Sequence, residues 1–131
     1  MVEVAAPGVA IDSTVPGDER LRMSGTSMAA PYVTNVAGLV KDANPSLNPA
    51  GIKKILMGTV DVKDFLKGKV TTSGIVNKER AIKAGLLSQT MSVDAAIRQS
   101  RSAVADQSVA AWGSRRVSDK DLIVLPLPST F

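Results

Sequence analysis

The sequence predicts a mixed α/β fold, in which short strands precede and separate amphipathic helices. Residues 2–8 alternate in hydropathy and end at a Pro-Gly pair, as a strand running into a loop does. From Thr26 onward, apolar residues recur at spacings of three and four, the period of one helix face. Two further helix starts follow, with a glycine-rich, β-branched stretch between them. Such interleaving of strands and helices is typical of the α/β class.

Residues 9–18 predict a second extended segment that ends in a turn at the Pro-Gly-Asp triplet, 16–18. The charged stretch 19–25 carries no prediction of a strand or helix. The first helix begins near Thr26, because Pro31 lacks an N–H and is tolerated only near a helix start. Its predicted buried face and its end are marked by Val33, Val36, Ala37 and Val40, and by Asn44-Pro45.

Asn48 and Pro49 predict the start of a second helix, with asparagine as the N-cap and proline at the first helical position. Leu47, before the cap, is placed to pack on Ile52 as a hydrophobic staple. The predicted buried face of this helix consists of Ile52, Ile55 and Leu56.

Residues 58–76 predict loops and one or two short strands, because glycines alternate there with β-branched residues. Asn77 predicts the N-cap of a third helix that runs through Ala84. Gly85 is the predicted stop of that helix, since glycine favours the position after a helix end.

The segment after residue 85 predicts one more helix, capped by Thr90 or Ser92 and reaching about Trp112 before Gly113. Residues 122–128 form an apolar run closed by prolines, which is typical of an edge strand or a docking tail. One apolar face of the helix is expected to dock on another element; it is formed by Val93, Ile97, Val104 and Ala111.

The composition excludes several functional classes. The chain has 131 residues, 44% of them apolar and 21% charged, and a net charge of +4 that is spread along the chain. A nucleic-acid partner is not expected, since it would favour clustered charge. No apolar run is long enough for a membrane span. Without cysteine there is no disulfide, thiolate zinc site or cysteine nucleophile, and without histidine the chain has no imidazole base.

The stretch 24–31, Ser-Gly-Thr-Ser-Met-Ala-Ala-Pro, carries the predicted chemistry. It resembles the nucleophile motif of the subtilisin-like serine proteases, which lies at the start of a long buried helix. The resemblance covers residues 2–85. It includes flanking segments on both sides of the motif, namely Val4–Val9, Ser13-Thr14, Val36–Val40, Pro45–Leu56 and Thr72–Ala81.

The resemblance implies that residues 1–85 are the C-terminal portion of a subtilisin-like peptidase domain, with residues 86–131 as an extension or linker. The complete fold would be three-layered α/β with a mostly parallel sheet. The family resemblance also implies a polypeptide substrate and a secreted or extracytoplasmic location. No cofactor is expected within this chain, and a calcium ion in the complete protein is left open.

The resemblance assigns Ser27 as the nucleophile, and its backbone N–H as a donor to the oxyanion. The residue chemistry agrees, because a helix N-terminus offers free N–H groups and a positive dipole end. Gly25 allows close backbone approach, Thr26 is placed to cap the helix or donate to the oxyanion, and Met28 would shield the site. The structural alternative is that Thr26 and Ser27 are only N-cap residues of an apolar helix.

A serine nucleophile needs an imidazole base and a carboxylate that orients it. In subtilisins the aspartate and the histidine precede the serine, and here only 26 residues precede Ser27, none of them histidine. Lys41 lies about four helical turns further on and is too far to act as the base. The chain alone is therefore expected to be inactive. It would act with the upstream part of the same catalytic domain or with a complementary chain.

Three residues raise questions beside the motif. Tyr32 stands where the family usually has a histidine that is not the triad base, and Asn35 stands where a glycine is usual. Burying Asn35 without partners would cost about 1–3 kcal/mol, which Gly38 could offset in part. Glu3 falls where some relatives place a cation-binding carboxylate, but one carboxylate is not a calcium site.

A non-enzymatic alternative follows from these departures: a decayed protease segment retained as an interaction or structural module. In either case, the apolar helix after Thr26 is expected to be exposed when the upstream strands are missing, and exposed apolar surface favours association. The face expected to be exposed consists of Val33, Val36, Leu39 and Val40.

Overall fold

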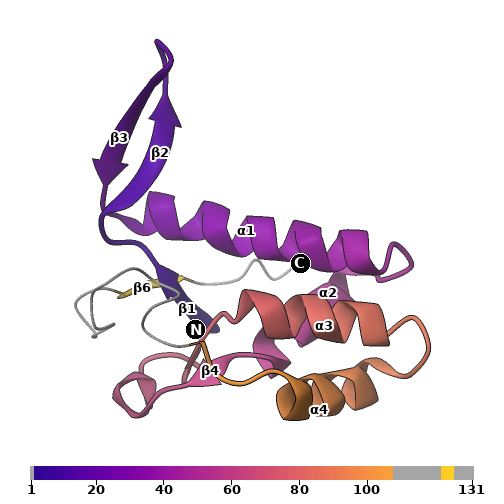
Figure 1. The fold of residues 1–131 in the computed structure, drawn as a ribbon. Helices are drawn as coiled ribbons and strands as arrows, with labels where there is room; N and C mark the ends of the chain where they lie inside the picture. The colour runs from indigo at the N-terminus through magenta and orange to yellow at the C-terminus, as the bar shows by residue number, and fades with distance from the viewer. Residues whose placement is uncertain (1, 108–121, 126–131) are drawn as a thin grey trace.

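The computed structural model describes residues 2–107 and 122–125, which fold as a mixed α/β unit, as predicted. Helix α1 (Thr26–Ala43) lies along one side, with α3 (Lys78–Leu87) beneath it and α4 (Val93–Ala103) beyond α3 (Figure 1). Helix α2 (Pro49–Gly58) packs against all three of these helices. None of the helices in the described ranges is long and apolar enough to cross a membrane.

A small sheet of four strands, in the order β4-β5-β1-β6, lies against α1. Strand β1 (Val4–Pro7) is central and pairs in parallel with β5 (Gly74–Ile75). On its other side β1 pairs antiparallel with β6 (Leu122–Leu125), so the apolar run contains an edge strand. The pairing of β4 (Asp61–Val62) with β5 is also antiparallel. The described part of the sheet therefore has one parallel pairing and two antiparallel ones.

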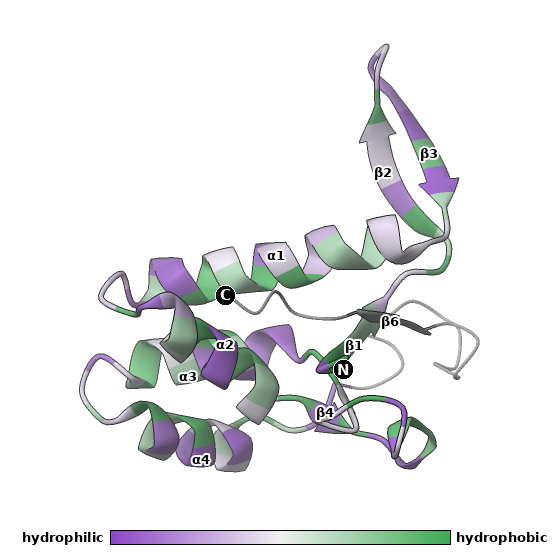
Figure 2. Ribbon diagram, turned by 180° about the vertical axis from the view of Figure 1, so that it is seen from behind, coloured by the Kyte–Doolittle hydropathy of each residue, from purple (hydrophilic) through white to green (hydrophobic). Residues whose placement is uncertain are grey.

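Strands β2 (Ile11–Val15) and β3 (Glu19–Met23) form a hairpin that projects beyond the N-terminal end of α1 (Figure 1). The predicted turn at 16–18 closes it, with positive φ at Gly17 (+91°) and Asp18 (+58°). The sequence pattern missed β3, because all five of its residues are exposed and no core requires a continuous apolar face there. Figure 2 shows hydrophilic and hydrophobic positions alternating along β3.

The main core lies between β1, α1, α2 and α3, and contains Val36, Val40 and Leu56 without solvent exposure. The expectation that the apolar face of α1 is exposed is wrong for its three valines: Val33 is 6% exposed and the other two are fully buried. The chain's own sheet and helices cover that face. Among residues 2–107, the large apolar side chains that are exposed lie elsewhere, at Leu21, Met23, Val62 and Leu86.

The predicted helix starts are confirmed by their caps. The Asn48 side chain accepts a hydrogen bond from the Gly51 N–H (2.8 Å). The Asn77 side chain accepts one from the Arg80 N–H (2.9 Å). Of the two predicted caps for α4, Ser92 is the one used; its hydroxyl accepts from Ala95 N–H at 3.2 Å. The staple residues Leu47 and Ile52 are both buried in the main core.

Two predicted helix ends are wrong. Helix α3 does not stop at Gly85 but continues to Leu87. A Cβ at Gly85 would lie 3.2 Å from both the Ala43 Cβ and the Val40 carbonyl, so this glycine allows α3 to pack closely on α1.

Helix α4 ends at Ala103 rather than near residue 112, because Val104 is extended (φ −121°, ψ 119°). The Val104 carbonyl accepts hydrogen bonds from the Arg80 side chain instead of continuing the helix. The predicted helix end at Trp112 and Gly113 lies outside the described residues.

Candidate functional site

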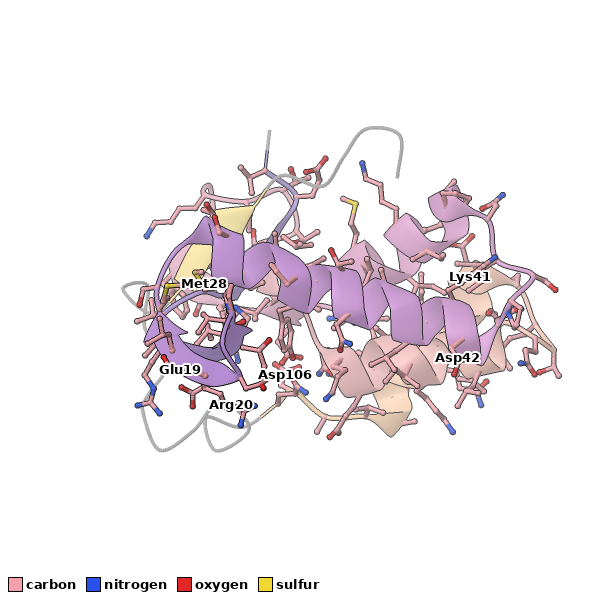
Figure 3. The ribbon with its side chains drawn as sticks, turned by 90° about the horizontal axis from the view of Figure 1, so that it is seen from above. Glu19, Arg20, Met28, Lys41, Asp42 and Asp106 are labelled. Carbon is pink, nitrogen blue, oxygen red and sulfur yellow. The ribbon has the colours of Figure 1, made fainter. Side chains whose placement is uncertain are left out.

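Ser27 is the second residue of α1, at the point where the hairpin returns to the body of the molecule. Its neighbour Met28 lies at that end of the helix (Figure 3). Ser27 is exposed. A serine nucleophile has to be accessible in this way to reach a carbonyl carbon of a substrate.

The turn before Ser27 is held by two hydrogen bonds to the loop that follows β1. The Gly25 N–H donates to the Gly8 carbonyl at 2.7 Å, and the Ala10 N–H donates to the Ser24 hydroxyl at 2.8 Å. The loop after β1 therefore holds the first turn of α1 in place, although the bonded residues lie 14 and 17 positions apart in the chain. The motif pointed to Gly25, but its sequence gave no sign that Gly8 and Ser24 anchor the turn.

Gly25 is the N-cap of α1 and has φ +158° and ψ 168°, a backbone conformation that is essentially restricted to glycine. A Cβ on Gly25 would lie 3.6 Å from the Met28 sulfur, so Met28 covers this face of the turn. Met28 is half-buried there.

The start of α1 leaves backbone donors available. The N–H groups of Met28 and Ala29 donate back to the Gly25 carbonyl, at 3.0 and 3.3 Å. The N–H groups of Thr26 and Ser27 come before the first such bond and have no acceptor within the helix. They lie at the positive end of an 18-residue helix, and such donors stabilise an anion.

The capping role considered for Thr26 and Ser27 is not found. Gly25 occupies the N-cap position, and no side chain makes a cap hydrogen bond there. Thr26 is exposed, as Ser27 is. Neither hydroxyl therefore caps the N-terminus of α1.

Lys41 lies at the opposite end of α1 from Met28 (Figure 3). Its ammonium donates to the carbonyls of Pro45 (2.6 Å) and Leu47 (2.8 Å), where it closes the turn after the helix. It therefore cannot serve Ser27 as a base, in agreement with the prediction from helix length.

Asn35 and Gly38 both lie on the exposed face of α1. Asn35 is exposed, so the burial cost considered for it does not arise. Gly38 is also exposed, and a Cβ on it would meet nothing within 4 Å. Gly38 is therefore not a compensating contact point.

Tyr32 is half-buried against the main core and is the chain's single tyrosine. Burial raises the pKa of its phenol above the ordinary value of 10.0, and the negative charge of Asp61 raises it further. Because the folded pKa exceeds the unfolded one, this contribution to stability is present below pH 10.0 and lost as pH rises through the folded pKa.

We expect a spectrophotometric titration of the native chain to show a phenolate midpoint above pH 10.0, because the pKa of Tyr32 is raised, and the chain in urea to titrate at about 10. Tyr32→Phe, which removes the phenol, is the blank. A native midpoint equal to or below the midpoint in urea would contradict the prediction.

Glu3 is not arranged as a metal ligand. The Lys53 ammonium lies 3.4 Å from the Glu3 carboxylate, and both side chains are largely buried, at 19% exposure for Glu3 and 23% for Lys53. A buried ammonium at this distance neutralises the carboxylate and occupies the space of a cation. No group of three or more His, Cys, Asp or Glu in the described part of the chain could hold a metal ion.

Comparison with known proteins places the motif in a family context. The sequence model of the subtilase family matches residues 1–113. Alkaline elastase YaB of Bacillus sp. (strain YaB) is 43% identical over 82 residues, which cover 61% of this chain and 21% of the elastase. Subtilisin Savinase of Lederbergia lenta is 39% identical over 80 residues, which cover 61% of this chain and 29% of the subtilisin.

A solved structure described as the structural basis of subtilase cytotoxin SubAB assembly contains a similar chain. The TM-score is 0.58 and the sequence identity 25%, over 78% of this chain and 28% of the other. The present chain thus spans between a fifth and a third of the length of these relatives.

Proposed function

The chain belongs to the subtilase family, and on that premise we propose that it provides the nucleophile-bearing part of a serine endopeptidase, with Ser27 as the nucleophile. The observation that carries the proposal is that Ser27 is exposed at the N-terminus of α1, beside the Thr26 and Ser27 N–H groups, which have no acceptor within the helix. Named relatives of the chain are proteases, which supports the same class of reaction.

In the proposed reaction, the Ser27 hydroxyl transfers its proton to an imidazole while its oxygen forms a bond to the carbonyl carbon of a peptide. The carbonyl oxygen becomes an oxyanion, and the Ser27 N–H, at the helix N-terminus, donates to it. The C–N bond then breaks, and the leaving amine takes the proton back from the imidazole. Water then attacks the acyl carbon. The imidazole takes a proton from the water and gives it to the Ser27 oxygen as the acyl–oxygen bond breaks.

The imidazole has to come from outside this sequence, which contains no histidine. We therefore propose that the chain is inactive alone. It would gain activity when residues bearing the histidine and the aspartate pack beside the α1 N-terminus, from the same polypeptide or a complementary one. Secretion is part of the same proposal, and so is polypeptide as the substrate. We assign no calcium ligand to this chain, because Lys53 occupies the space beside Glu3.

The test uses a fluorophosphonate probe, which reacts with an activated serine. The probe is applied to the native source material, and the labelled peptide and the mass of its polypeptide are identified. We expect the peptide containing Ser27 to be labelled, on a longer polypeptide or on this chain within a complex. The purified chain alone should show no more labelling than its Ser27→Ala variant.

If the 131-residue chain is present intact in the source and Ser27 is unlabelled, the protease proposal fails. The chain is then a non-catalytic interaction or structural module of the same family. Labelling of the purified chain alone, above the Ser27→Ala background, would refute the requirement for an external base.

A further inference from the structure

Arg80 of α3 places a guanidinium group in the protein interior, with 3% of its side chain exposed. Its donors reach two other segments. On one side lie the carbonyls of Thr59 (3.3 Å) and Val60 (3.1 Å). On the other side, the chain after α4 offers the Val104 carbonyl at 2.9 Å and the Asp106 carboxylate at 2.8 Å. One buried cation thus ties the end of α4 to the body of the molecule.

Asp61 of β4 completes the buried network, with 2% of its side chain exposed. One carboxylate oxygen accepts from Arg80 (3.0 Å) and from the Asn77 amide (2.8 Å). The other accepts from the Gln107 backbone N–H (2.9 Å). The Asn77 amide also donates to the Ala105 carbonyl at 3.3 Å.

Each of the four residues 104–107 therefore makes a polar contact with Arg80, Asp61 or Asn77. Arg101, in the last turn of α4, adds a bond to the Gly58 carbonyl at 2.8 Å. Hydrogen bonds that share donors and acceptors in a low-dielectric interior strengthen one another. The contacts of this segment are thus expected to form and break together.

The apolar contribution of α4 to its own docking is small. Its two fully buried residues, Ala96 and Ser100, have short side chains, and Val93 and Ile97 are only half-buried. The Lys54–Asp94 ion pair is more than half exposed on both sides and contributes little. Polar contacts therefore add to the apolar packing of Val93 and Ile97 in attaching α4 to the body.

We propose that residues 93–107 form a strap, whose closure on the body is controlled by the buried guanidinium of Arg80. The strap opens as one unit while β1 and α1 remain folded. When it is closed, the Arg80 charge is matched by Asp61, by Asp106 and by three carbonyl groups. Opening removes the Val104 and Asp106 acceptors together, so the buried guanidinium keeps Asp61 but loses the acceptors of its other donors, which opposes opening.

The location of the strap supports an independent opening. Helix α4 lies at the far side of α3 from α1 (Figure 1), and it packs on α3 and α2. Helix α4 reaches the main core, which contains Val36 and Val4, only through the partly buried side chains of Val93 and Ile97. Units that share few apolar contacts with the main core are the ones that open below the global free energy of unfolding.

Amide hydrogen exchange of the full chain, followed peptide by peptide by mass spectrometry, tests the strap. We expect Arg80→Met to speed exchange in residues 93–107 on the order of 100-fold, because it removes the buried cation and leaves the Asp61 carboxylate without a positive charge beside it. Exchange in residues 33–40 of α1 should change less than about threefold.

Arg98→Met is the matched control, since it removes an exposed arginine from α4 itself. Its exchange should equal that of the unaltered chain. Asp106→Asn provides a milder second variant, because Asp106 is half exposed and pairs with Arg80. It should speed exchange in the strap by about tenfold, which corresponds to the loss of one charge-assisted hydrogen bond. This variant tests the strap if Arg80→Met does not fold.

Two results would overturn the proposal. One is unchanged protection of residues 93–107 in the folded Arg80→Met variant, or in Asp106→Asn if the first does not fold. The other is an equal loss of protection in the strap and in α1, which would mean that the network stabilises the whole fold and that no separate strap exists.

Discussion

Replacement of Ser27 by alanine is expected to lower the kcat of peptide hydrolysis on the order of 10⁶-fold, the loss that removal of the serine causes in subtilisin. The enzyme measured is this chain together with the polypeptide that supplies the histidine and the aspartate. Alanine removes the only atom that forms the acyl bond, while the backbone N–H groups at the α1 N-terminus remain. The residual rate should therefore still exceed the rate in water.

Ser102→Ala is the matched control for this change. Ser102 lies on α4, is exposed, and makes only a long hydrogen bond to the Arg98 carbonyl, at 3.4 Å. Its kcat and KM should stay within about twofold of the unaltered enzyme, since surface substitutions rarely change stability by more than about 0.5 kcal/mol. A Ser27→Ala enzyme that retains more than a thousandth of the activity would assign the nucleophile to another residue.

Gly74→Ala is expected to destabilise the fold by about 3 kcal/mol, the upper part of the range for overpacking. A Cβ at Gly74 would lie 2.3 Å from the Val60 Cγ2, 2.6 Å from its Cβ and 3.1 Å from the Asp61 carbonyl. Val60 is 2% exposed, and its β-branched side chain has few alternative rotamers. The backbone of β4 or β5 would have to move to relieve the contact.

Urea unfolding of the full chain, alone or in the complemented enzyme, measures this loss as a lower midpoint with an unchanged slope. Gly38→Ala is the control, because Gly38 is exposed in α1 and has open space around it. It should stabilise the chain by about 0.5–1 kcal/mol, since alanine is the better helix former. Equal midpoints for the two variants would show that the contact at Gly74 relaxes without cost.

Local chemistry explains why the helix starts were predictable. Asn48, Asn77 and Ser92 each cap a helix with a side chain only three residues from its donor, so a short sequence window contains both partners. The same holds for the turn at residues 16–18, where Gly17 takes a positive φ. The motif around Ser27 is likewise contiguous, and the residues that would act there follow one another in the chain.

Long-range contacts explain what the sequence pattern missed. Gly85 reads as a helix stop, but its neighbours in space are Val40 and Ala43 of α1, and these make it a packing contact inside α3. Helix α4 ends early because Arg80, 24 residues upstream, takes the Val104 carbonyl. The partners of Gly85 and Val104 lie too far away in the sequence for a local helix pattern to include them.

The sequence by itself determined the α/β class, the helix starts and the place of Ser27 at the first turn of a helix, because period, caps and motif are local properties of the chain. Only the tertiary structure decided how that turn is anchored to Gly8, and which charges meet in the interior. Hydrogen-bond partners such as Arg80 and Asp106 are chosen by burial, which removes water as the competing partner.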